Sequence, residues 1–198
     1  MSYVDMFYGS AGKKDFKSLR TKEKEAALYY LYMMSDGKVS KKEETLFKKL
    51  CKELEIDDNS KENIISLCEN SDDKDDVLEI IKRENLEEDA IRFFFLSNVD
   101  KKKLARLVWN LINLGYADEN YSDDEKEIVA YIAEKNSLDK GIVREFTDIA
   151  DTMLALTKQK KWADSAIEND DEKRMKKKEI SREITKLSES IQVIIDEI

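Results

Sequence analysis

Carboxylates offer the main candidate chemistry in this chain. Asp36 and Glu43 stand seven positions apart in the first half, and Asp118 and Glu125 repeat that spacing in the second half. Hard divalent cations take carboxylate oxygens as ligands and need no histidine. If the fold brings the two segments together, these four side chains are candidate metal ligands for Ca²⁺, Mg²⁺ or Mn²⁺.

The same residues also have a purely structural interpretation. Ser40 and Ser122 each precede a candidate glutamate by three positions, just before an apolar helical pattern. Ser-x-x-Glu is a capping box, in which the serine hydroxyl accepts from the glutamate amide and the glutamate carboxylate accepts from the serine amide. Such a cap contributes roughly 0.5–2 kcal/mol. Capping explains the two glutamates and leaves the two aspartates, four positions before each serine, without a required role.

The spacing excludes an EF-hand. Counted from Asp36, loop position 6 is Lys41 and position 12 is Phe47, where an EF-hand needs glycine and a bidentate glutamate. Any cation site would therefore be of another kind.

The absence of histidine restricts the chemistry further. It excludes Ser-His-Asp and Cys-His catalysis and every histidine-ligated metal site. Cys51 and Cys68 form no CxxC pair, which excludes a zinc ribbon, and both lie on apolar helical patterns. We interpret them as reduced core residues, with a redox or disulfide role as the alternative. Because no pair of carboxylates is marked out as catalytic, we expect a protein that is not an enzyme.

Helices are the elements that must position these residues. The 198 residues include no proline and five glycines, 41% are apolar and 40% are charged, and period-two alternation is rare. This pattern predicts an all-α fold with about nine helices joined by short turns capped by Ser, Asp and Asn. The helices are expected at about 17–34, after Ser40, around 64–68, from Ser71, at 85–96, after Asp100, after Ser122, over 142–156, and from the charged stretch to the C-terminus.

An internal repeat relates the two acidic segments. At a constant offset of 82 residues, Asp36 falls on Asp118 and Glu43 on Glu125. The serines of the two capping boxes also coincide, and apolar positions match downstream, with Phe47 on Val129. The repeat predicts a compact helical bundle built from two duplicated helical hairpins, followed by a C-terminal amphipathic helix.

The duplicated motif, an apolar helix followed by Ala/Ser-Asp-Gly-x-x-Ser-x-x-Glu and another helix, resembles that of the TerB-like (tellurite-resistance) family over about residues 22–156. The resemblance implies a compact helical bundle, a metal site at the paired acids Asp36, Glu43, Asp118 and Glu125, and a link to tellurite and other stress responses. The second copy departs from the pattern because Glu119 replaces the glycine.

The chain divides into three expected parts. Residues 1–15 are predicted to be an irregular N-terminus, residues 16–156 the TerB-like helical domain, and residues 157–198 a charged linker and an amphipathic or coiled-coil helix. The charged stretch at 157–172 is compatible with a linker or with a continuing helix.

The C-terminal helix carries a heptad pattern of apolar residues, Ile180, Ile184, Leu187, Ile191, Ile194 and Ile198. Such a stripe must be buried against the parent domain, a second copy of the chain or a protein partner. A membrane-surface helix is disfavoured because the stripe is narrow and acids follow the preceding lysines.

The overall charge and hydropathy limit the partners and the cellular location that we expect. A net charge of −9 argues against nucleic acid as a partner, because its phosphates would be repelled. No apolar run approaches the roughly 20 residues of a transmembrane segment, and the N-terminus does not have the pattern of a signal peptide, so we expect a cytoplasmic protein. We predict a non-enzymatic binding or scaffold module of a bacterial stress-response or defence system. The alternative is a divalent-metal-binding protein or sensor that uses the duplicated acidic turns.

Overall fold

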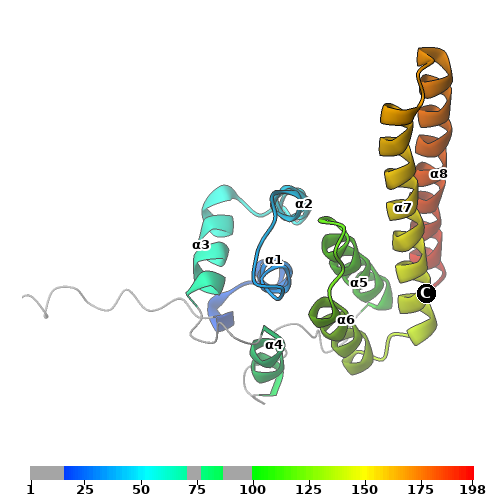
Figure 1. Ribbon diagram of the computed structural model, residues 1–198. Coiled ribbons are helices and arrows are strands. Elements are labelled where there is room, and N and C mark those ends of the chain that lie inside the picture. Colours follow the sequence, from blue (N-terminus) through cyan, green and yellow to red (C-terminus); the bar gives the residue numbers. More distant parts are fainter. Residues whose placement is uncertain (1–15, 71–76, 87–99) are drawn as a thin grey trace, which may run out of the picture.

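The described part of the chain is entirely helical. The computed structural model describes residues 16–70, 77–86 and 100–198, and within them it contains eight α-helices, one short 3-10 helix and no strand (Figure 1). The elements are η1 (Phe16–Ser18), α1 (Thr21–Met33), α2 (Lys41–Glu53), α3 (Asp58–Glu69), α4 (Val77–Leu86), α5 (Lys101–Gly115), α6 (Asp123–Lys135), α7 (Lys140–Ala166) and α8 (Asp170–Glu197). The predicted all-α class is confirmed. The expected irregular N-terminus, the start of the predicted fourth helix at Ser71 and most of the helix predicted at 85–96 lie outside the described residues.

Helix α1 is the centre of the bundle. Every residue from Ala26 to Met33 is buried, and α1 contacts α2, α3, α4 and α5. A helix that is apolar all round is stable in water only when other elements surround it. The sequence pattern therefore predicted this position correctly.

The second half of the domain packs on the first through α5. This helix buries one apolar face that includes Leu104, Val108, Leu111 and Ile112, and it contacts α1, α2, α6, α7 and α8. Because α5 meets elements from both halves, the buried residues of the two halves form one continuous core, whereas Ala163 and Ile180 are buried outside it, within the arm.

Short polar residues cap the N-terminal ends of helices in this chain without proline. The side chains of Asp57, Asp100, Asp139 and Asn169 each accept a hydrogen bond from a backbone amide in the first turn of the following helix. These bonds satisfy amides that have no partner within the helix. The expected use of Ser, Asp and Asn caps is confirmed.

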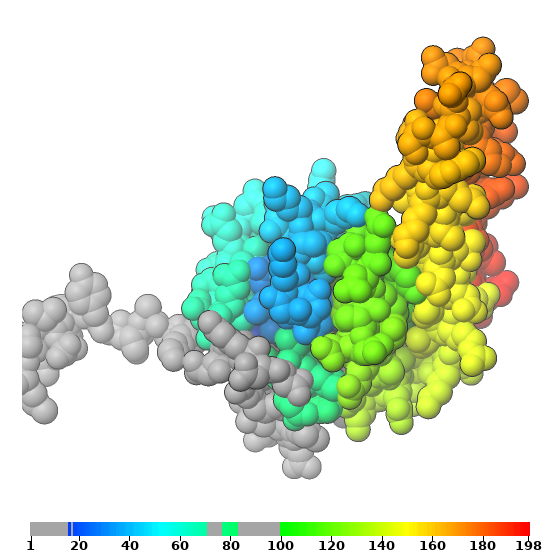
Figure 2. Space-filling view, viewed as in Figure 1, coloured from blue at the N-terminus to red at the C-terminus, as the bar shows by residue number. Residues whose placement is uncertain are grey.

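Helices α7 and α8 form an antiparallel arm that extends beyond the rest of the molecule (Figures 1 and 2). Of the two alternatives for the charged stretch, the continuing helix is the one observed as far as Ala166, and only residues 167–169 separate α7 from α8. The heptad residues Ile180 and Ile191 are buried, as is Ile195, and the other four heptad residues are half-buried. Helix α8 thus folds back onto α7 and α5. None of the described helices has the length and apolar character needed to cross a membrane.

Candidate functional site

The first acidic turn connects α1 to α2 and is closed by its own side chains. Asp36 Oδ1 accepts from the Lys38 amide at 3.0 Å, and Gly37 has a left-handed backbone with φ of 84°. At the start of α2, Ser40 Oγ accepts from the Glu43 amide at 3.2 Å, while Glu43 Oε2 accepts from the Ser40 amide at 2.6 Å. The predicted capping box is confirmed here.

The second acidic turn, between α5 and α6, repeats these bonds. Asp118 Oδ1 accepts from the Asn120 amide at 2.8 Å. Ser122 Oγ accepts from the Glu125 amide at 3.2 Å, and Glu125 Oε2 accepts from the Ser122 amide at 2.7 Å. Glu119 has φ of 75°, close to that of Gly37, so replacement of the glycine has not changed the shape of the turn. The second capping box is confirmed as well.

The fold brings the two acidic turns together. Glu43 and Glu125 are 2% and 3% exposed, and burial raises the pKa of both carboxyls, that of Glu125 to about 7. Neighbouring charges act in the same direction. Asp36 and Asp118 raise the pKa of Glu43, and Asp36 and Glu43 raise that of Glu125. All four predicted site residues therefore belong to one electrostatic cluster, although each glutamate also caps its own helix.

A tyrosine hydroxyl adjoins the cluster without a hydrogen-bond partner. Tyr32 is completely buried, and its hydroxyl makes no hydrogen bond of acceptable geometry among the described residues, although the Tyr121 hydroxyl lies close enough to interact with it and to help raise its pKa. The charges of Glu43 and Glu125 reach this hydroxyl and help to raise its pKa, after the larger effect of burial. The sequence predicted that Tyr32 lies in the core. It did not predict that the Tyr32 hydroxyl lies beside Glu43 and Glu125, because the apolar pattern of α1 does not distinguish Tyr32 from its neighbours.

Gly115 makes room for the two tyrosines. A Cβ at this position would lie 2.6 Å from both Tyr32 Oη and Tyr121 Cδ2. Real side chains do not approach so closely, so the last residue of α5 must be glycine for the rings to pack beside the acidic turns. The sequence alone did not indicate that Gly115 provides this space beside the acidic turns.

The four carboxylates are the type of ligand that a hard divalent cation prefers, but their arrangement in the structure does not form a metal site. The four carboxylates supply only oxygen ligands, and the hydrogen bonds above use one oxygen of each. However, the described residues contain no group of three or more acid or thiol side chains arranged to hold a metal ion. A cation would have to draw the remaining oxygens inward by side-chain rotation.

Glu119 connects the second turn to two other elements. Its Oε1 pairs with Lys42 of α2 at 3.0 Å and with Lys161 of α7 at 2.5 Å. These two hydrogen-bonded ammonium groups lower the pKa of Glu119 to about 2. The residue that departs from the repeated motif thus joins the acidic turns to the α7–α8 arm.

The two cysteines are core residues. Cys51 and Cys68 are both buried thiols, and burial raises the pKa of each, that of Cys51 to about 11. A buried thiol with a raised pKa is a poor nucleophile and metal ligand. This environment agrees with the predicted core role.

Comparison with known protein families identifies a match to most of the helical domain. The family model described as tellurite resistance protein TerB matches residues 22–145, which is more than half of the chain and includes both acidic turns. No curated protein and no solved structure matches the chain.

Proposed function

The chain belongs to the TerB tellurite resistance family, as its duplicated motif predicted, and on this basis we propose that it is a non-enzymatic binding or scaffold module of a bacterial stress-response or defence system. We place it in the cytoplasm, with a protein as its partner. Its net charge of −9 disfavours nucleic acid.

The observation that carries this proposal is the exposure of two large apolar side chains on the α7–α8 arm. Trp162 is 61% exposed and Met175 is 72% exposed, and both lie toward the end of the arm where α7 and α8 are joined. Tryptophan and methionine are enriched at protein interfaces. The helices beneath them are held together, since Lys177 pairs with Asp164 at 2.6 Å and Lys160 donates to Ser181 at 2.8 Å. The arm therefore presents these side chains on a fixed support.

Site-specific photo-crosslinking in the native cell tests the proposal. A photoreactive residue at Trp162 or Met175 should give a discrete adduct, whereas the same residue at the exposed position Glu62 of α3 should give none. An adduct of twice the chain's 23.1 kDa mass would identify self-association, and another mass would identify a different protein. Equal labelling at all three positions, or none, would contradict the proposal.

We also infer that the helical hairpins on either side of the two acidic turns arose by duplication. The matched hydrogen bonds of the turns and the left-handed φ at both Gly37 and Glu119 support this inference, since such details need not coincide in unrelated turns. The closeness of the two turns then follows from the packing of one copy on the other.

A second candidate function is binding of a divalent cation, as a metal-binding protein or sensor. The charges that act on the buried Glu43 and Glu125 favour it, because a cation would relieve the repulsion that the neighbouring carboxylates exert on these two side chains. The buried Tyr32 hydroxyl adds one further oxygen at the same place.

Calorimetric titration with Ca²⁺, Mg²⁺ and Mn²⁺ tests this second function. One of the cations should bind the native chain, and the double substitution Asp36→Asn with Asp118→Asn should abolish the heat. Asp58→Asn with Asp171→Asn is a matched control, because it removes the same charge from exposed positions in α3 and α8. Absence of binding at millimolar cation, the weak end of known calcium sites, would leave capping as the role of the turns.

A further inference from the structure

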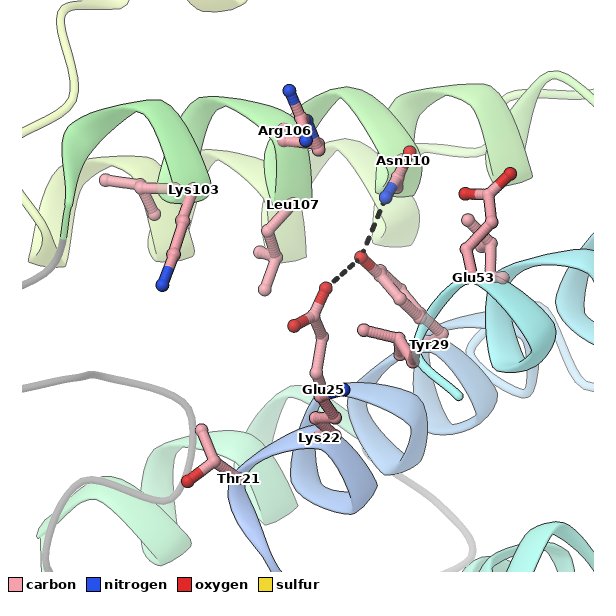
Figure 3. Close-up of a pocket in the computed structure, with 12 residues that line it drawn as sticks. Thr21, Lys22, Glu25, Tyr29, Glu53, Lys103, Arg106, Leu107 and Asn110 are labelled. Atoms are coloured by element: carbon pink, nitrogen blue, oxygen red, sulfur yellow. Dashed lines mark hydrogen bonds between the residues drawn. The ribbon is translucent and has the colours of Figure 1, made fainter. Parts of the chain in front are cut away.

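A second potential site lies at the ends of α1, α2 and α5 that are opposite to the acidic turns. A cavity of about 510 Å³ opens between α1, α2 and α5 (Figure 3). Four leucines supply its apolar lining, Leu50, Leu54, Leu104 and Leu107. A cavity with an apolar lining and a few polar groups is typical of small-molecule sites.

One wall of the cavity holds an oriented carboxylate. Tyr29 Oη donates to Glu25 Oε1 at 2.7 Å and accepts from Asn110 Nδ2 at 3.0 Å, so the three side chains form a fixed chain from α1 to α5 (Figure 3). Tyr29 is fully buried, and Glu25 is half-buried. These bonds use only one oxygen of Glu25, and the carboxylate has no ion pair in the described part of the chain. Burial raises the pKa of Glu25, while the hydrogen bond from Tyr29 and the charge of Lys103 act in the opposite direction.

The opposite wall carries an ammonium group that makes no ion pair among the described residues. Lys103 of α5 points toward the cavity in Figure 3, and its charge acts on Glu25. The two groups nevertheless form no ion pair within 4.0 Å, and Lys103 makes no other ion pair among the described residues. Of the other cations in the lining, Lys22 pairs with Glu55, whereas Arg106 donates a hydrogen bond to the neutral amide of Gln192. The cavity therefore lies between the exposed ammonium group of Lys103 and the half-buried carboxylate of Glu25.

We propose that this cavity binds a small zwitterion of the aliphatic amino-acid class. The ammonium group of the ligand pairs with Glu25, its carboxylate pairs with Lys103, and its aliphatic part lies against the leucines. A simple anion would be repelled by Glu25, and a simple amine would be repelled by Lys103. A ligand with both charges complements both walls, and its ammonium group supplies the half-buried carboxylate with the cation that it lacks.

Calorimetric titration of the full chain with leucine, and with 5-aminovalerate as a longer zwitterion, tests the inference. At least one of the two should bind. Isoamylamine and 4-methylpentanoate, which each lack one charged group of leucine, should bind at least about tenfold more weakly, because each loses a charged hydrogen bond. If the acid alone binds as tightly as the zwitterion, the cavity is an anion site and the proposal is wrong. If neither zwitterion binds at about 10 mM, a concentration far above ordinary metabolite affinities, it is wrong as well.

Two substitutions locate the binding. Glu25→Gln retains an acceptor for Tyr29 but removes the charge, and Lys103→Gln removes the ammonium group. Each should weaken binding of the zwitterion by about tenfold or more. The matched controls are Glu62→Gln in α3 and Lys101→Gln at the start of α5, both exposed and outside the lining, and they should bind normally. Thermal melting of every variant shows whether it is folded, and folded Glu25 and Lys103 variants with native affinity would overturn the assignment.

Discussion

Glu55 and Ser137, which stand 82 residues apart, adopt the same left-handed backbone conformation, with φ angles of 59° and 54°. Each follows the end of a helix that begins with a capping box. The next residue then donates its amide back into the helix, Ile56 to Cys51 and Leu138 to Ala133, both at 2.9 Å. The 82-residue correspondence therefore extends beyond the acidic turns to the ends of α2 and α6.

Replacement of Ser137 by glycine should stabilise the protein. Glycine adopts a left-handed conformation without the Cβ clash that costs other residues roughly 1–2 kcal/mol, so we expect a gain of about 1 kcal/mol. Ser165→Gly, within the right-handed helix α7, should instead cost about 0.5 kcal/mol. Urea unfolding measures both changes, and a loss of stability in the Ser137 variant would contradict the strain argument.

Loss of either capping serine should weaken its helix. Ser40→Ala and Ser122→Ala each remove the acceptor for a glutamate amide, at a cost of about 1 kcal/mol. Ser188→Ala, at an exposed position within α8, should be neutral or slightly stabilising, because alanine favours helix. Chemical denaturation at neutral pH gives the comparison. Near-equal effects of the two cap substitutions are expected, and no effect in either would show that the boxes do not contribute.

Removal of the Tyr32 hydroxyl should increase stability. A buried hydroxyl without a partner costs about 1–3 kcal/mol, and Tyr32→Phe removes that cost while it retains the ring. Tyr29→Phe should have the opposite effect, since the Tyr29 hydroxyl makes two hydrogen bonds. Thermal melts in the presence of a chelator distinguish the two variants. Destabilisation by Tyr32→Phe would mean that a water or an ion satisfies the hydroxyl.

The stability of the protein should fall as pH rises through neutrality. The folded-state pKa of Glu125, about 7, lies above its ordinary value of 4.5, so the folded protein holds this proton more tightly than the unfolded chain. The resulting stabilisation is complete below about pH 4.5 and is lost as pH rises through about 7. In the Glu125→Gln variant, the free energy of unfolding should therefore fall less between pH 5 and pH 8 than in the native chain, by on the order of 2 kcal/mol.

Urea unfolding at several pH values, with a chelator present, measures this difference. Asp123→Asn is the control, because Asp123 is an exposed acid in the same turn whose pKa is lowered by its bond to Lys126. An identical pH dependence in the Glu125 variant and the native chain would contradict the prediction.

The C-terminal helix should contribute to the stability of the core. Ile195 is 2% exposed and belongs to the main apolar cluster, so Ile195→Ala should cost about 2–4 kcal/mol. Val193 of the same helix is 54% exposed, and Val193→Ala should change stability by less than about 0.5 kcal/mol. Differential scanning calorimetry compares them, and equal melting temperatures would mean that α8 is not docked in solution.

Local spacing in the sequence determined the helices, their caps and the resemblance to TerB proteins. A capping box joins residues only three positions apart, so Ser40 with Glu43 and Ser122 with Glu125 could be identified without knowledge of the fold. The apolar run from Ala26 to Met33 likewise predicted a central helix, because no exposed helix can be apolar on every face.

Only the tertiary structure decided which of these local features meet. The charges of Glu43 and Glu125 interact because the fold places the two acidic turns near each other, and the bonds of Glu119 to Lys42 and Lys161 depend on where α2 and α7 lie beside the second turn. The facing of Glu25 and Lys103 across one cavity depends likewise on the packing of α1 against α5. Helix periodicity specifies which face of a helix is buried, but residues distant in the chain meet through the crossing angles of the helices. Those angles arise from the fit of all the buried side chains together.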